Sequence, residues 1–116
     1  HKQRCDQWLE LEERFGTGVN YPSFPKWKEY TWQAQLHLFT CALYYIEYGI
    51  AELGALQLWS RFRKNPEDAV ALYYSALGMG GSKPLPELFE AAGIQFAMDK
   101  ETMEPLIEAV AGELKK

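Results

Sequence analysis

An apolar stretch over residues 36–59 constrains the fold of this chain more than any other feature. Hydrophobic side chains would occupy almost every side of a helix drawn over it, which predicts one helix that is buried all round. Small residues in the stretch, Gly54 among them, predict that a neighbouring helix approaches its backbone closely. A membrane span is the competing interpretation, but Glu47 and Glu52 would each cost about 2.5 kcal/mol or more at the centre of a bilayer. We therefore expect no membrane partner.

Periodic apolar residues and capping residues predict further helices on both sides of this stretch. Asn65 followed by Pro66, for example, combines an N-cap residue with a proline at the first helical position. Residues 94–98 are interpreted as an extended connector, since no strand pattern of convincing length occurs. Three predicted helices cover residues 5–15, 26–35 and 36–59, and Gly16 closes the first of them. Two more begin at Asn65 and Pro86, and Asp99 caps the last one. The sequence thus predicts an all-α fold, a single bundle of about five or six helices, in which residues 1–116 form one domain.

Composition and charge narrow the classes of partner. The 116 residues are 47% hydrophobic and 15% aromatic, which favours one folded domain with apolar surface left for a partner. The net charge is −4 and the one basic cluster, near Arg61 and Arg63, lies where a helix should end and face its dipole, so we expect no nucleic-acid partner. Cys5 and Cys41 have no partners at ligand or disulfide spacing, and the N-terminal residues resemble no export signal. A cytoplasmic location is expected.

Three places in the sequence bear on phosphate, metal or nucleophile chemistry. The glycine-rich turn at Gly78 follows a predicted helix and lacks the Gly-Lys-Ser/Thr order of a phosphate-binding loop, so it is interpreted as a helix terminator. Cys41 and His37 are four residues apart, which would place a thiol and an imidazole near each other, but this spacing is a weak signal. No H-E-x-x-H motif occurs, and His1 and His37 are the only histidines. The chain's own residues are therefore not expected to bind zinc.

One long run of residues resembles a known family. The run is Gln35-Leu36-His37-Leu38-Phe39-Thr40-Cys41-Ala42-Leu43-Tyr44-Tyr45-Ile46-Glu47-Tyr48-Gly49-Ile50-Ala51-Glu52-Leu53-Gly54-Ala55-Leu56-Gln57-Leu58-Trp59. Flanking runs continue it, such as Trp8-Leu9-Glu10-Leu11-Glu12 and Glu90-Ala91-Ala92-Gly93-Ile94. Together they resemble the oligoendopeptidase F and thimet oligopeptidase family of zinc metallopeptidases. The resemblance implies an almost wholly helical catalytic domain, of which this chain would be the C-terminal part.

The resemblance also implies roles for three side chains. His37 matches a family histidine, and Tyr45 and Tyr48 match paired tyrosines that face the metal across the substrate cleft. All three would bind substrate, and the two tyrosines would also stabilise the oxyanion of the tetrahedral intermediate. In one continuous helix Tyr45 and Tyr48 would share a face, whereas His37 and Tyr48 would be more than about 10 Å apart. Joint action of His37 and Tyr48 therefore requires a bend or a helix start between them.

We expect this chain to be a fragment of a cytoplasmic zinc metalloendopeptidase that hydrolyses short peptides. Zinc would be held by an H-E-x-x-H helix and a glutamate in the missing part of the parent enzyme, so the fragment alone should be inactive. Its expected partners are short peptide substrates, the missing zinc-binding part, and a second copy through exposed apolar surface. The alternative is a stand-alone helical module that binds a protein or peptide without cutting it. A third hypothesis is a cysteine hydrolase that uses Cys41 and His37.

Overall fold

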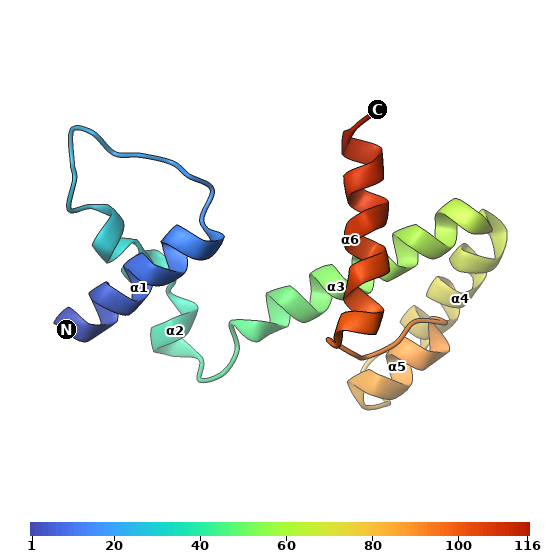
Figure 1. Cartoon of the computed structure of the whole chain (residues 1–116). Helices are drawn as coiled ribbons and strands as arrows, with labels where there is room; N and C mark the ends of the chain where they lie inside the picture. Colours follow the sequence, from blue (N-terminus) through green and yellow to red (C-terminus); the bar gives the residue numbers. More distant parts are fainter. The chain divides into compact units, whose positions relative to one another are not determined.

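A computed structural model describes residues 1–116 and contains seven helices and no strand (Figure 1). The all-α class is confirmed, with seven helices instead of about five or six. Residue contacts divide the chain into two compact units, His1–Tyr45 and Ile46–Lys116. That residues 1–116 belong to one larger catalytic domain stays a prediction. The helices are α1 (Lys2–Phe15), the 3₁₀ helix η1 (Lys28–Ala34), α2 (His37–Thr40), α3 (Ile46–Lys64), α4 (Pro66–Met79), α5 (Leu85–Ala91) and α6 (Lys100–Leu114).

The unit His1–Tyr45 is built on the contact between α1 and η1. Trp8 Nε1 of α1 donates a 2.8 Å hydrogen bond to Thr31 Oγ1, which itself donates to the Lys28 carbonyl. Cys5 and Trp32 are the buried residues of this unit. The predicted end of α1 at Gly16 is confirmed, and the helix predicted over residues 26–35 is present as the tighter η1.

The prediction of one buried helix over residues 36–59 is wrong. The chain forms the single turn of α2, leaves helical structure after Thr40, and begins α3 only at Ile46. Most of the stretch before α3 is exposed, Leu43 by 93% of its surface, and within α3 only Leu53 and Gly54 are buried. A helix with apolar side chains on every side is buried only where other helices cover all of those sides. The other helices of each unit cover too little of this stretch to bury it.

The unit Ile46–Lys116 packs α4 and α6 against α3, and α5 against α4. Figure 1 shows α6 crossing the long α3. At Gly54 of α3 a Cβ would lie 3.1 Å from Cζ of Phe89 in α5, so the missing side chain leaves room for this aromatic ring. A close approach of a neighbouring helix to the α3 backbone stays a prediction. The buried residues of this unit are Leu53, Gly54, Ala69, Phe89, Ala92 and Leu106.

Side-chain caps start two of these helices where the sequence predicts them. Asn65 Oδ1 accepts from the backbone N–H of Asp68 at 3.3 Å, and Asp99 Oδ1 accepts from that of Thr102 at 2.8 Å. Each cap satisfies a helix N–H that has no partner within the helix. The start of α4 after Asn65 and of α6 after Asp99 is confirmed.

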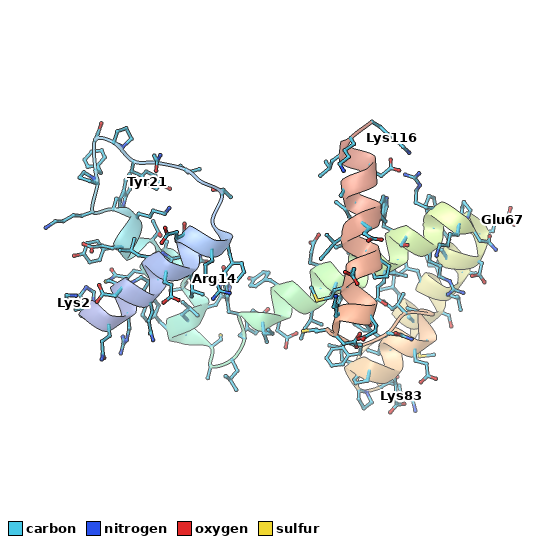
Figure 2. All side chains as sticks on the ribbon, in the orientation of Figure 1. Lys2, Arg14, Tyr21, Glu67, Lys83 and Lys116 are labelled. Carbon is cyan, nitrogen blue, oxygen red and sulfur yellow. The ribbon has the colours of Figure 1, made fainter.

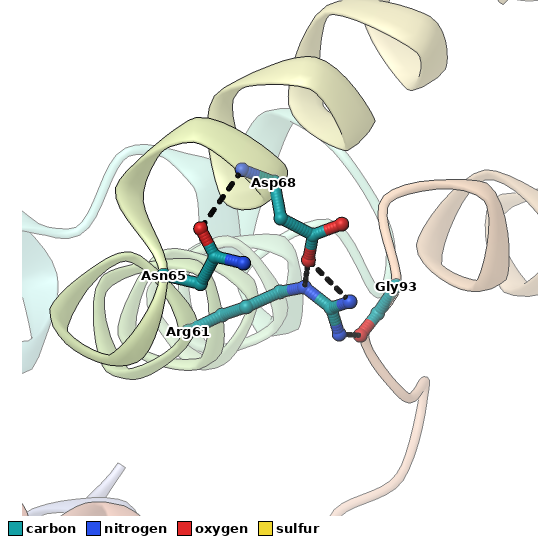
Figure 3. A network of polar contacts seen from close by, with 4 residues as sticks. All are labelled: Arg61, Asn65, Asp68 and Gly93. Carbon is teal, nitrogen blue, oxygen red and sulfur yellow. Dashed lines mark hydrogen bonds and ion pairs between the residues drawn. The ribbon is translucent and has the colours of Figure 1, made fainter.

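Arg61 ties the end of α3 to two other segments (Figure 3). Its Nε and Nη2 donate to Asp68 Oδ2 at 3.0 and 2.7 Å, and its Nη1 donates to the Gly93 carbonyl at 3.0 Å. The basic cluster does lie in the last turn of α3, as predicted. The basic cluster also forms ion pairs between helices, which the sequence did not reveal. Besides Arg61, Arg63 pairs with Glu113 of α6 at 2.7 Å.

The extended connector predicted over residues 94–98 is confirmed. The Gln57 side chain forms two hydrogen bonds with the backbone of this connector. Its Nε2 donates to the Gln95 carbonyl at 2.8 Å, and its Oε1 accepts from the Gln95 N–H at 2.9 Å. Phe96 of the connector packs edge-on against Phe89. No helix of the chain is both long enough and apolar enough to cross a membrane.

Candidate functional site

His37 lies among tyrosine rings in the unit His1–Tyr45. The imidazole is stacked on the Tyr44 ring, with centroids 5.5 Å apart and planes at 17°, and it lies 6.2 Å from the Tyr45 ring at 40°. His37 is the first residue of α2, and both tyrosines lie in the turn that follows this helix. Two phenols and an imidazole near one another offer hydrogen-bond donors to a carbonyl or to an oxyanion.

The turn that brings these rings together is strained at Leu43. This residue has φ +60°, in the left-handed region, which costs a non-glycine residue about 1–2 kcal/mol. The Tyr44 N–H donates to the Cys41 carbonyl at 3.3 Å and closes the turn.

Tyr48 belongs to the other unit, Ile46–Lys116, and lies in the first turn of α3. Tyr45 lies one residue before that helix, so helical spacing no longer fixes the direction of the two tyrosines relative to each other. The helix start that joint action of His37 and Tyr48 requires does occur, at Ile46. The assignment of Tyr45 and Tyr48 as catalytic residues, and of His37 as a substrate-binding residue, stays a prediction.

Tyr44 is the residue that the sequence interpretation missed. In a continuous helix it would point away from the face of Tyr45. The structure instead stacks the Tyr44 ring on His37, because the chain turns at Leu43 just before Tyr44.

A zinc ion does not fit this chain's own residues. No group of three or more histidine, cysteine or carboxylate side chains lies in a position to hold a metal ion. Structural zinc sites need four such ligands, and catalytic ones need three together with an open position for water. Cys41, the other reactive side chain considered above, is an exposed free thiol at the end of α2.

The unit Ile46–Lys116 carries an apolar pocket of about 350 Å³ between α3, α4 and α5. It is lined by small residues of α3 and by larger side chains such as Leu88 and Phe89. Two other large lining side chains are about half exposed, Tyr73 by 44% and Leu77 by 56%. The pocket thus offers apolar surface without charged side chains.

Comparison with known proteins leaves the family open, because no protein-family model, no curated protein and no solved structure matches this chain.

Proposed function

We propose that this chain is the C-terminal part of the catalytic domain of a cytoplasmic zinc oligopeptidase, a metalloendopeptidase that hydrolyses short peptides. The sequence run from Gln35 to Trp59 carries this proposal, because it places a histidine, three tyrosines and a glutamate in a largely apolar setting. Two structural observations support it. The His37 and Tyr45 rings lie 6.2 Å apart, and a new helix begins between His37 and Tyr48.

In this proposal the chain supplies the substrate side of the active site. His37 and Tyr45 bind the peptide backbone, and Tyr45 and Tyr48 donate hydrogen bonds to the oxyanion as it forms. Zinc would be held by an H-E-x-x-H helix and a glutamate in the missing part of the parent enzyme, where it would supply polarisation of the scissile carbonyl and activation of water. In this proposal the chain alone has no peptidase activity, because its own residues form no group that could hold zinc. Activity requires the zinc-binding part of the parent enzyme.

Turnover of a short peptide by the intact parent enzyme tests the proposal. Tyr48→Phe removes one hydroxyl and is expected to lower kcat by about 10² to 10³, since preorganised oxyanion donors contribute that much. Tyr74→Phe is the matched control, because Tyr74 is 69% exposed on α4 and has no assigned role. Equal kcat values for the two variants would remove Tyr48 from the mechanism. An upstream coding sequence without an in-frame H-E-x-x-H would remove the peptidase proposal as a whole.

The apolar pocket of the unit Ile46–Lys116 favours a second candidate function, a helical module that binds a protein or peptide without cutting it. Such a module would bind an apolar peptide equally well with and without zinc. Leu77→Asp would place a charge in the pocket wall and abolish that binding, whereas Tyr74→Asp, on the same helix outside the pocket, would not. Cleavage of the peptide by the zinc-loaded parent would decide for the enzyme.

Self-association through apolar surface is part of the proposal for the isolated chain. Side chains such as Phe15, Phe24 and Leu114 are 73%, 62% and 84% exposed. Exposed apolar area of this kind favours association in water. Sedimentation at increasing concentration should therefore reveal dimers or larger species, and a strictly monomeric chain would count against it.

A further inference from the structure

A second pocket lies within the unit His1–Tyr45, between α1, η1 and α2. Its volume is about 470 Å³, and its lining differs from that of the apolar pocket described above. Aromatic walls come from Trp8, Trp32 and Phe39, whereas Arg4 and Gln7 supply polar groups. A cavity of this size that combines apolar walls with a few polar groups is typical of small-ligand sites.

The charge that lines this pocket is positive only. Arg4 is its only charged lining residue, and the Arg4 guanidinium carbon lies 5.9 Å from the centroid of the Trp32 ring. Arg4 takes part in none of the ion pairs of the chain, and Asp6, the nearest acid along α1, pairs with Lys2. An arginine without a carboxylate partner beside apolar walls complements an anion, which it can bind with two parallel N–H groups.

Trp32 lines the pocket and has a buried N–H without an acceptor. The residue is 8% exposed, and its Nε1–H is buried without a hydrogen-bond partner. Most buried N–H groups are paired, as Trp8 Nε1 is with Thr31, so an unpaired one calls for an explanation. The Nε1 atom is closed to solvent, so the Trp32 ring forms a wall of the pocket, and its indole N–H signal reports on what lies against that wall.

We propose that this pocket binds a carboxylate carried on an apolar body, such as an N-acylated aromatic or aliphatic amino acid. Arg4 forms an ion pair with the carboxylate, and the apolar body packs against Trp8 and Phe39. The proposal does not depend on the peptidase assignment, because it uses neither His37 nor the tyrosines. It would hold equally if the chain were a binding module.

N-acetyl-L-phenylalanine and its uncharged primary amide form a matched pair of probes. Titration of the full chain with each is followed by the indole N–H signals in ¹⁵N–¹H spectra, where Trp32→Phe identifies the Trp32 signal. We expect the acid to shift the Trp32 signal saturably and the amide to bind about tenfold or more weakly, because charge-assisted hydrogen bonds are the stronger ones. The signals of Trp27 and Trp59, which do not line the pocket, should stay in place.

A comparison of Arg4→Gln with Arg14→Gln separates binding in the pocket from the effect of the chain's net charge. Both make the same change on α1, and Arg14 lies toward the other end of the helix from Lys2 (Figure 2). Its guanidinium carbon lies 4.9 Å from the Phe15 ring, outside the pocket. Arg4→Gln should weaken binding of the acid about tenfold or more, and Arg14→Gln should leave it unchanged. Equal affinity for acid and amide, native affinity in Arg4→Gln, or no saturable shift in the millimolar range would each overturn the proposal.

Discussion

Arg61 donates a 3.0 Å hydrogen bond from Nη1 to the backbone carbonyl of Gly93, while the same guanidinium binds Asp68 (Figure 3). One side chain thereby joins the end of α3, the first turn of α4 and the turn after α5. Gly93 has φ +71°, and a Cβ there would lie 2.9 Å from Cδ1 of Leu72 and 3.0 Å from the guanidinium carbon of Arg61. Conformation and space both require glycine at this position.

Gly93→Ala is therefore expected to lower the free energy of unfolding of the unit Ile46–Lys116 by about 1–3 kcal/mol. The added methyl group meets the Arg61 guanidinium, and the positive φ disfavours any residue with a Cβ. Urea unfolding followed by circular dichroism measures the change. A loss smaller than that of an ordinary surface substitution would show that this turn does not need its glycine.

Gly112→Ala should act in the opposite direction. Gly112 lies inside α6, its φ is not positive, and a Cβ there would have no neighbour within 4 Å. Alanine in a helix interior is more favourable than glycine by about 0.8–1 kcal/mol. The same urea titration should thus show a gain of that order. Since both variants add one methyl group, their opposite signs would show that the local surroundings of each glycine decide the outcome.

Helix starts are the part of the fold that could be predicted from sequence. Asn65 and Asp99 each bind an N–H three residues further on, so the cause and its effect lie within one turn. The pairing of Arg61 with Asp68 could not be predicted in this way. It depends on the angle between two helices, which no local pattern contains.

The break at residues 41–45 was missed for a related reason. Leucine disfavours a positive φ, so nothing in Leu43 itself indicates the turn. The apolar pattern of the surrounding stretch is equally compatible with a continuous helix. The same turn places Tyr45 before the start of α3, so Tyr45 and Tyr48 do not share a face of one helix as expected. The resemblance of His37, Tyr45 and Tyr48 to family positions does not depend on that face.

Acid should weaken the contact between α3 and α6. Arg63 and Lys116 each donate to Glu113 Oε1 at 2.7 Å, and these hydrogen bonds lower the pKa of Glu113 from 4.5 to about 2. The unfolded chain therefore binds a proton at this carboxyl at a higher pH than the folded chain does. The stabilisation is complete above the unfolded pKa of 4.5 and is lost as the pH falls toward about 2.

Glu113→Gln tests this dependence, because glutamine cannot titrate. The melting temperature of the native chain should fall more steeply between pH 4.5 and 2 than that of the variant, and the two curves should converge at the acid end. Glu108→Gln is the control, as it makes the same change on α6 at a residue that forms none of the ion pairs. Parallel curves for the native chain and Glu113→Gln would contradict the prediction.

Leu43→Gly should stabilise the turn that holds His37 beside Tyr44. Leu43 is 93% exposed, so its side chain contributes almost no packing, whereas its φ of +60° is unfavourable for leucine. Glycine removes that strain but adds freedom to the unfolded chain, which leaves a net gain of about 0.5–1 kcal/mol. The amide of Tyr44, whose hydrogen bond closes the turn, should exchange about two- to fivefold more slowly with solvent. Ala42→Gly is the control, because Ala42 has no positive φ and glycine there should speed exchange. Faster exchange in Leu43→Gly would mean that the turn owes its shape to the leucine side chain, and the contact between His37 and Tyr44 would then depend on Leu43 as well.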